Sequence, residues 1–343
     1  MRPLTPRRIA GICGMLAAIL FAVMVISLRT GSYPISVVDI VKTLYHGVLG
    51  QRDAVSTDDW LVVFGLRLPR IALAILVGAS LSVAGAGFQA LLRNPLADPY
   101  VLGVSSGAAL GAILSLLLTP HVPGAIQLAS FLGAAVTIAA VFFLGRRGGH
   151  LDSPTLLLAG IISASFLSSI IMMLMALLPG RDLRGVLFWL MGDLTTSPPT
   201  TNVAGWFAFL FTVFLLSAGA MYTTSTDLNL ILSGEQEARH LGVNVSRVKL
   251  VVYISASLLT GLAVSVSGAI GFVGLLLPHA MRMIFGTDYR ILLPTSALGG
   301  AIAIVLADTI GRTVLAPMEL PVGAMTALAG APVFIYLMRR RVR

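Results

Sequence analysis

The segment PRIALAILVGASLSVAGAGFQALL, residues Pro69–Leu92, carries one charged side chain, Arg70, among its 24 residues. A run of about 20 apolar residues is long enough for an α-helix to cross a lipid bilayer. Nine further segments are similarly apolar, at residues 9–28, 101–118, 126–144, 156–178, 203–222, 248–268, 270–285, 292–311 and 322–338. The 343-residue chain, with a mean hydropathy of +0.95, is therefore predicted to be an all-α polytopic membrane protein, with about ten transmembrane helices in a single domain, residues 1–343.

The first of these segments follows Arg2, Arg7 and Arg8 and so resembles a signal peptide. Its apolar run is long, however, and the sequence SLRTG that follows offers no pair of small residues for cleavage. We interpret it as a retained helix. The single cysteine, Cys13, lies inside it, so an internal disulfide and a multi-cysteine site are excluded and we predict no metal site.

The distribution of basic residues indicates which side of the membrane each loop occupies. Ten spans place both termini on one side. If that side is the cytoplasm, the inner segments hold 15 of the 23 lysines and arginines and six acids, whereas the outer segments hold eight of each. Cytoplasmic loops carry this excess of basic residues, so we predict a multi-pass protein with both termini cytoplasmic. The net charge of +9 then needs no nucleic-acid partner.

Two segments in different halves of the chain have similar sequences. AGAGFQALLRNPLA, Ala84–Ala97, and SGAIGFVGLLLPHA, Ser267–Ala280, share a small-residue run, a phenylalanine, paired leucines and a proline. The second copy begins five spans after the first, and an odd offset reverses orientation, so the pattern predicts an inverted internal repeat. Chance similarity among Gly/Ala/Leu-rich helices is the alternative. Glycines spaced four apart, Gly103, Gly107 and Gly111, indicate close packing between helices.

Several kinds of chemistry are missing from the sequence. The only lysines, Lys42 and Lys249, do not end a P-loop, so this chain is not expected to hydrolyse ATP in that way. The one clear acid within a span, Asp308, precedes Arg312 by four residues, which is the spacing of a self-neutralising pair. No HExxH, GxSxG or paired-carboxylate pattern occurs, so we predict that the chain is not an enzyme and has no catalytic residues.

A polar stretch interrupts the apolar sequence between spans six and seven. SGEQEARHLGVNVSR, Ser233–Arg247, begins with an S-x-x-Q pattern typical of a helix capping box and continues to a glycine, Gly242, that is typical of a helix end. It predicts a short cytoplasmic helix. A helix of two turns is only marginally stable in water, so it is expected to pack against its own spans or a partner protein. A solvated helix on the membrane surface is the alternative.

At this point the sequence resembles a known family. LSGEQEARHLGV (232–243) is similar to the cytoplasmic coupling-helix segment of the iron-chelate and cobalamin class of bacterial ABC importer permeases, the FecCD-type family. Further similar segments follow the family's order over nearly the whole chain: RLPR (67–70), LVGASLSVAGAGFQALLRNPLADPYVLGVSSGAALGA (76–112), LLLAG (156–160), GAIGFVGLLLPHAMR (268–282), TDYRILLP (287–294), LADTIGR (306–312) and ELPVGAMTALAGAPVFIYLM (319–338).

The resemblance implies a type II ABC importer permease fold in the bacterial inner membrane. It also implies a homodimer with the pathway between the two subunits, two ATP-binding-cassette ATPase subunits, and a periplasmic or lipoprotein solute-binding protein. ATP and Mg would then bind the partner subunit, and no cofactor is expected on this chain. The implied cargo is a metal chelate: siderophore–iron, haem or cobalamin. A secondary transporter without an ATPase is the alternative function.

The resemblance also suggests roles for particular residues. The ATPase-coupling set is Ser233, Gly234, Glu235, Ala238, Arg239, Leu241 and Gly242, with Ala238 allowing close approach of the ATPase. Arginines near the outer ends of spans two and nine, Arg67, Arg70 and Arg312, are expected to dock the binding protein. The cytoplasmic gate is expected at Asn94, Leu96, Ser153 and Pro154, although Pro154 stands where this family has a small hydroxyl residue.

Overall fold

The computed structural model describes residues 5–31, 33–119, 122–147, 150–177, 180–195 and 202–341. Each of the ten predicted spans is an apolar helix in these ranges, and seven of the helices are long and apolar enough to cross a membrane. Their bounds are α1 (Pro6–Arg29), α4 (Leu68–Leu91), α5 (Val104–Leu118), α6 (Ala125–Leu144), α7 (Ser153–Leu177), α9 (Val203–Thr223), α12 (Val245–Ser267), α13 (Val273–Phe285), α14 (Tyr289–Thr313) and α15 (Val322–Arg341).

Shorter elements connect these helices. They are α2 (Val37–Val48), η1 (Arg52–Ala54), α3 (Thr57–Trp60), the π-helical turn η2 (Leu61–Arg67), η3 (Pro99–Leu102), α8 (Gly180–Leu190), α10 (Ser225–Ser233) and α11 (Glu235–His240), with an antiparallel pair of two-residue strands, β1 (Arg146–Arg147) and β2 (His150–Leu151). The long loop before α4 is therefore largely helical.

Polar side chains mark where several long helices begin. The side chains of Asn202, Asn244 and Asp288 accept hydrogen bonds from backbone N–H groups in the first turns of α9, α12 and α14. These N–H groups have no partner within their own helix. Each of these three helices thus begins at a residue whose side chain satisfies a free backbone N–H group.

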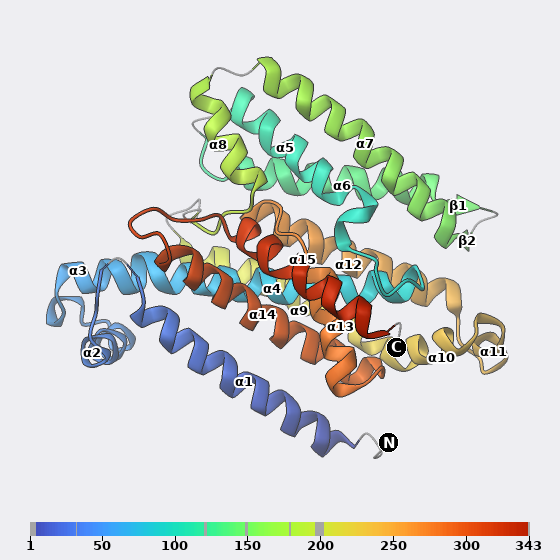
Figure 1. Ribbon diagram of the computed structural model, residues 1–343, viewed down its shortest axis with the longest axis horizontal. Helices are drawn as coiled ribbons and strands as arrows, with labels where there is room; N and C mark the ends of the chain where they lie inside the picture. The colour runs from blue at the N-terminus through green and yellow to red at the C-terminus, as the bar shows by residue number, and fades with distance from the viewer. Residues whose placement is uncertain are drawn as a thin grey trace.

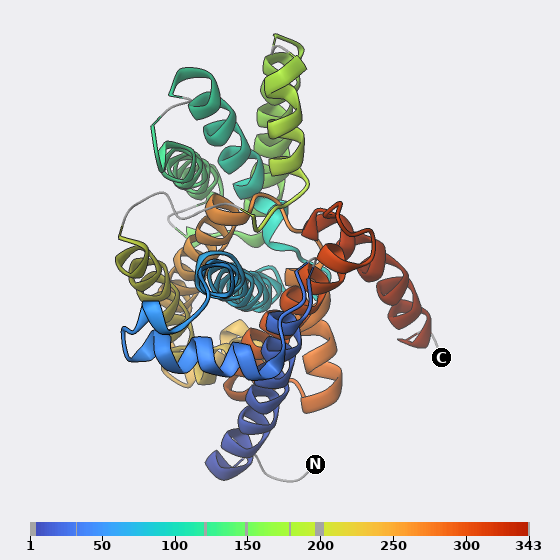
Figure 2. The same cartoon turned by 90° about the vertical axis from the view of Figure 1, so that its left-hand side faces the viewer.

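Helix α4 lies at the centre of the bundle, between α12 and α14 (Figures 1 and 2). In its most apolar window 89% of residues are buried, against 11% for the peripheral α1. Small side chains permit this position: a methyl group at Gly85 would overlap the carbonyl oxygen of Gly274 in α13. Backbones that approach this closely gain van der Waals contact without a large side chain between them.

The glycine pattern in α5 has the predicted effect. Methyl groups at Gly107 and Gly111 would overlap the carbonyl oxygens of Gly133 and Ala129 in α6, and α5 packs along α6. Gly103 lies just before α5 with φ +75° and forms its N-cap. The small-residue spacing therefore marks a close helix pair, as predicted.

The two similar segments do not share a conformation. Residues 84–91 complete α4, whereas residues 268–272 are non-helical and α13 begins only at Val273. The packing of the helices nevertheless follows the inverted repeat. In the first half α4 packs on α13 and α14, and in the second half its counterpart α12 packs on α5 and α6. Each half thus packs its second span, α4 or α12, against two helices of the other half.

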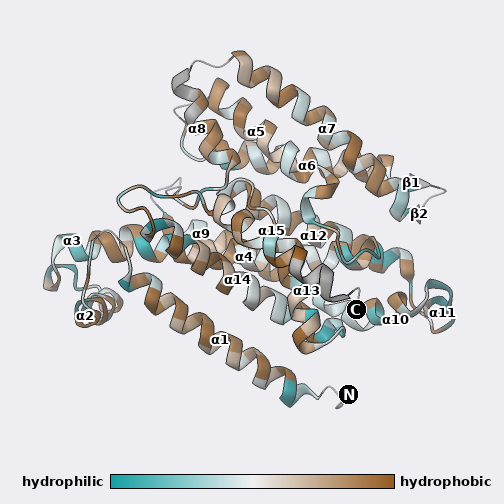
Figure 3. Ribbon diagram, in the orientation of Figure 1, coloured by the Kyte–Doolittle hydropathy of each residue, from teal (hydrophilic) through white to brown (hydrophobic). Residues whose placement is uncertain are grey.

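The two ends of the bundle carry different elements. Both termini, α10, α11 and the β1–β2 pair lie at one end, and α2, α3 and α8 lie at the other (Figure 1). Hydrophilic residues are prominent on α11, β1, β2 and α3, whereas the helices between the ends are mainly hydrophobic (Figure 3). We call the end that carries α11 the α11 end and the opposite end the α2 end.

Candidate functional site

The segment Ser233–Arg247 forms the turn between α10 and α12, with α11 in its middle. The predicted capping box is wrong. Ser233 is the last residue of α10, and its hydroxyl donates to the carbonyl of Asn229, 3.3 Å away, within the same helix. A capping residue must leave the helical conformation; here Gly234 does so, and no side chain caps α11. Gly242, with φ +87°, follows α11 as predicted.

Helix α10 is fixed to the start of α14 by one asparagine. Asn229 Nδ2 donates to Asp288 Oδ1 at 2.8 Å, and Asn229 Oδ1 accepts from the backbone N–H of Tyr289 at 2.9 Å. Asp288 also accepts a hydrogen bond from Arg290. This bond lowers the pKa of Asp288 to about 2, although partial burial acts in the opposite direction. The α10–α11 segment is thus attached firmly to the membrane helices.

The predicted ATPase-coupling residues divide into a buried and an exposed group. Ala238 is fully buried among residues such as Ile231 and Val245, so the prediction that it lies at the ATPase contact is wrong. Leu241, in contrast, is 69% exposed, and the side chain of Arg239 is 60% exposed. Of the predicted coupling residues, those that a partner can reach are therefore Ser233, Arg239, Leu241 and Gly242.

Glu235 points toward this chain rather than away from it. Its Oε1 lies 2.7 Å from Lys249 Nζ in α12 and 3.1 Å from Arg93 in the loop after α4, and Oε2 lies 3.9 Å from Arg239. Partial burial raises the pKa of Glu235, but the hydrogen bond and charge of Lys249, followed by Arg93 and Arg239, outweigh it, so the pKa is lowered. The ionised carboxylate of Glu235 thus contacts cations from α11, from α12 and from the loop after α4.

The predicted gate residues lie beside this ion cluster. Ser153, at the start of α7, donates to the carbonyl of Leu91 at the end of α4, 2.9 Å away. Asn94 and Leu96 are exposed in the next loop, where Asn94 Oδ1 accepts from the Leu96 N–H. A hollow of about 490 Å³ is lined by Ser153 and the exposed Pro154 together with Arg93, Glu235, Arg239 and Lys249.

Arg93 and Lys249 were absent from the sequence-based site. Arg93 reaches α11 through a contact with Glu235, which is distant in the sequence, so no local signal pointed to it. Lys249 lies only 14 residues after Glu235, and as one of two lysines in the chain it could have been noticed. The structure therefore brings the coupling segment and the gate together and adds two cations between them.

The arginines predicted to dock a binding protein face inward at the α2 end. Arg67 is buried and donates to the carbonyls of Leu28, at 2.5 Å, and Tyr33. Arg70 lies 2.8 Å from Asp308 and 2.7 Å from Glu319.

Arg312 is also buried, donates to the hydroxyl of Ser27 and forms the predicted pair with Asp308, at 3.0 Å. The docking role of the three arginines stays a prediction, and in this chain all three already have internal partners. Their guanidinium groups compensate buried carbonyls and carboxylates, because an unpaired charge in this interior would be costly, and they hold α1, α4 and α14 together.

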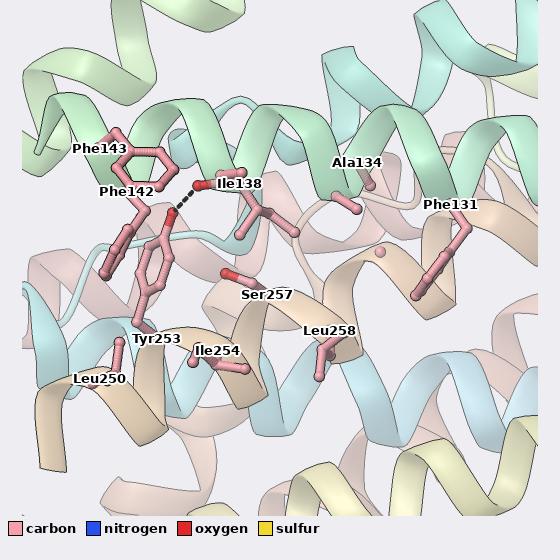
Figure 4. A pocket seen from close by; sticks show the side chains of 13 residues that line it. Phe131, Ala134, Ile138, Phe142, Phe143, Leu250, Tyr253, Ile254, Ser257 and Leu258 are labelled. Atoms are coloured by element: carbon pink, nitrogen blue, oxygen red, sulfur yellow. Dashed lines mark hydrogen bonds between the residues drawn. The ribbon is translucent and has the colours of Figure 1, made fainter. Parts of the chain in front are cut away.

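A second hollow lies between α6 and α12. It has a volume of about 300 Å³ and is lined by aliphatic and aromatic side chains such as Phe131, Ile138 and Phe142 (Figure 4). The hydroxyl of Tyr253 donates to the Ile138 carbonyl at 2.7 Å. Ser257 is the other polar side chain in this wall. A wall of this kind suits apolar groups and offers little to orient a charged chelate, so we do not place the transport pathway here.

Comparison with known proteins agrees with this arrangement. The model of the FecCD transport family matches residues 19–340. The chain is 42% identical over 281 residues to the cobalamin import system permease protein BtuC of Halobacterium salinarum, covering 82% of this chain and 74% of that protein. It is 41% identical over 293 residues to the hemin transport system permease protein HmuU of Yersinia pestis, covering 83% and 86%.

A solved structure has the same fold. It is described as an inward-facing conformation of a metal-chelate type ABC transporter, and it superposes with a TM-score of 0.80 at 32% identity, covering 96% of this chain and 99% of that one. The predicted type II permease fold is confirmed. Members of such transporters move solute while the ATPase role lies on another subunit. The chain belongs to the FecCD transport family of ABC importer permeases.

Proposed function

We propose that this chain is the membrane subunit of an ATP-driven importer that carries a metal chelate, siderophore–iron, haem or cobalamin, into the cytoplasm. It would act as a homodimer with two ATPase subunits and a separate solute-binding protein. The α11 end would face the cytoplasm of a bacterial cell. The observation that carries the proposal is the position of α11, whose outer side is exposed while Glu235 on its inner side lines the same hollow as Ser153 and Pro154 of the predicted gate.

The exposed side of α11 has the character of a protein contact. Leu241 lies beyond the membrane helices and is largely exposed, next to the cationic Arg239. An apolar side chain flanked by charge is favourable at an interface, where burial removes it from water and charge selects the partner. Asn229 attaches α10 to the start of α14. A force on Leu241 would therefore be passed through α10 to the membrane helices.

The comparisons support a chelate as cargo but do not separate the candidates. Relatives named for cobalamin and for hemin are almost equally similar, at 42% and 41% identity. Both of these cargoes are large macrocyclic metal complexes. A bulky metal chelate is therefore the common element, and direct transport assays must choose among the three classes.

The alternative of a secondary transporter has less support. An ion-coupled carrier places acids deep in its spans where they can bind and release the coupling ion. Asp308, the acid identified within a span, is already paired with Arg70 and Arg312. Family membership points the same way, since the relatives are ABC permeases.

The gate assignment is tested by cross-linking. Asn94 and Leu96 are exposed, so in a homodimer they can face their counterparts across the symmetry axis. In a Cys13→Ser background, cysteine at Asn94 should cross-link between subunits in one nucleotide state and much less in another. Absence of cross-links in every state would remove Asn94 from the gate. Cysteine at Ser153 tests the same idea less directly, because its hydroxyl binds the Leu91 carbonyl.

The function as a whole is tested in proteoliposomes. The chain is co-purified with its associated ATPase and binding protein, and uptake of an iron–siderophore, haem and cobalamin is measured with ATP, with a non-hydrolysable analogue and with an ion gradient alone. We expect uptake of one chelate class that requires ATP and the ATPase subunit. Uptake driven by the ion gradient without an ATPase would refute the proposal in favour of a secondary transporter.

A further inference from the structure

Arg93 adopts a backbone conformation that arginine disfavours. It follows the end of α4 with φ +50°, in the left-handed region. Glycine is the usual residue at such a position after a helix, because the Cβ of any other residue lies too close to the backbone there. The arginine side chain must therefore serve a purpose that glycine would not.

That side chain crosses from the membrane helix to the coupling segment. Arg93 Nη2 donates to the carbonyl of Ile231 in α10 at 3.1 Å and lies 3.1 Å from Glu235 Oε1 in α11. The Ile231 carbonyl is in the last turn of α10, where cations are favoured by the exposed carbonyl groups and the helix dipole. One guanidinium thus contacts both short helices.

Glu235 is held in place from the other side. Lys249 in α12 contacts the same oxygen, Oε1, at 2.7 Å, and its side chain is only 14% exposed. The carboxylate therefore cannot leave Arg93 without also changing its contact with Lys249. Partly buried pairs of this kind are screened less by salt than surface pairs.

The end of α4 is in turn connected to the predicted gate. Asn94 follows Arg93 directly, and the Leu91 carbonyl accepts from Ser153 in α7. The 490 Å³ hollow beside these residues provides space for the loop and the start of α7 to move. The contacts form a continuous path from α11 through Glu235 and Arg93 to Asn94 and Ser153.

We propose that Glu235 and Arg93 form a latch that transmits movement of α11 to the gate loop, and that Lys249 is a positioning residue that keeps Glu235 aligned. The inference rests on the proposed function, in which an ATPase moves α11. It assigns Glu235 to force transmission inside the permease rather than to the ATPase contact.

The variant Arg93→Gly separates the latch from a structural role. Glycine accepts the left-handed backbone, so the substitution removes the side chain while relieving the backbone. If Arg93 only ends α4, the variant should be as stable as the wild type and transport normally. The latch predicts intact complexes that hydrolyse ATP, with chelate uptake per ATP reduced by at least about fivefold, the lower range of measured couplings between sites.

Controls use the same reconstituted transporter. Arg93→Lys keeps the cation and should retain most of the coupling. Arg146→Gln removes an exposed cation near β1 at the same end and should leave uptake per ATP unchanged. If Arg93→Gly fails to fold, Glu235→Gln carries the same test, because the amide keeps the size of the side chain and removes its charge.

A double-mutant cycle tests whether the two residues act as one unit. Arg93→Gly combined with Glu235→Gln should reduce uptake per ATP no further than the stronger single variant. Fully additive losses, or normal coupling in Arg93→Gly, would overturn the latch. The proposed function is separable from it: if Leu241→Asp disrupts ATPase binding while Arg93→Gly transports normally, only the latch is wrong.

Discussion

Asp308 Oδ1 lies 2.8 Å from Arg70 Nε, across the contact between α14 and α4. The carboxylate is 1% exposed and also pairs with Arg312. Asp308→Asn would leave two buried guanidinium groups with reduced compensation, and removing one partner of a buried pair costs about 3–5 kcal/mol. We expect a large loss of thermal stability in detergent, measured by the unfolding midpoint of the purified protein.

Glu319→Gln is the matched control for that prediction. Glu319 also contacts Arg70, at 2.7 Å, but is 41% exposed, so its loss should cost about 0–1 kcal/mol. Equal unfolding midpoints for the two variants would show that the buried pairs of Asp308 with Arg70 and Arg312 stabilise the fold no more than the exposed pair of Glu319 with Arg70 does.

Close packing of α4 depends on the absence of a side chain at Gly85. Gly85→Ala places a methyl group on the Gly274 carbonyl and should reduce the yield of folded protein, measured by size-exclusion chromatography and thermal unfolding. Gly14→Ala in α1 is the control, because no atom outside its own helix lies near the added methyl group. A normal yield for Gly85→Ala would show that α4 and α13 can separate without cost.

Asn229 rather than Ser233 should stabilise the coupling segment. Asn229→Ala removes two hydrogen bonds to the start of α14 and should cost about 1–3 kcal/mol. Ser233→Ala removes one exposed bond within α10 and should change stability by less than about 0.5 kcal/mol. Proteolysis of the α10–α11 segment in the folded protein measures the difference, and equal protection of the two variants would refute it.

Asp288 makes the attachment of α10 sensitive to acid. Its pKa falls from 3.8 to about 2 mainly through the hydrogen bond from Arg290, so ionised Asp288 stabilises the folded state at any pH above about 4. Because the folded pKa is the lower one, this contribution is lost as the pH falls from about 4 to 2. The stability difference between wild type and Asp288→Asn should be constant from pH 6 to 8 and shrink below pH 4. A difference that changes between pH 6 and 8 would contradict this assignment.

The ATPase contact is tested at Leu241. Leu241→Asp places a charge on the exposed side of α11 and should weaken co-purification of the ATPase subunit at least tenfold, the effect of about 1.4 kcal/mol. Val48→Asp, on the 88% exposed side chain at the α2 end, should leave the complex intact. Normal ATPase binding by Leu241→Asp would place the contact elsewhere on the α11 end.

Apolar composition and length were sufficient to predict the spans. An apolar run has few alternatives to a membrane helix, and all ten predicted runs are helices in the structure. The i,i+4 pair of Asp308 and Arg312 was also predictable, because it depends on one helix alone. The family resemblance then identified the coupling and gate segments, and the structure places these side by side at the α11 end.

Where the structure departs from the sequence-based expectations, the residues around the site give no sign of it. Arg67 binds carbonyls 39 and 34 residues away, and Arg70 meets Asp308 238 residues away, so nothing near either arginine shows that it points inward. Ala238 lies in a charged stretch, yet the packing of α10 and α12 buries it. Local sequence also could not show that α10 extends through Ser233, so that this serine ends α10 instead of capping α11.

The central position of α4 has a consequence for biogenesis. A ribosome adding about 5–20 residues per second reaches Asp308 about 10–50 s after Arg70, because 238 residues separate them. During that interval the nascent α4 carries an uncompensated guanidinium, and the later helices that enclose it do not yet exist. The newly inserted segment must then be sheltered by the translocon, by an insertase or by lipid headgroups, so membrane insertion of this chain can fail before the second half of its sequence is translated.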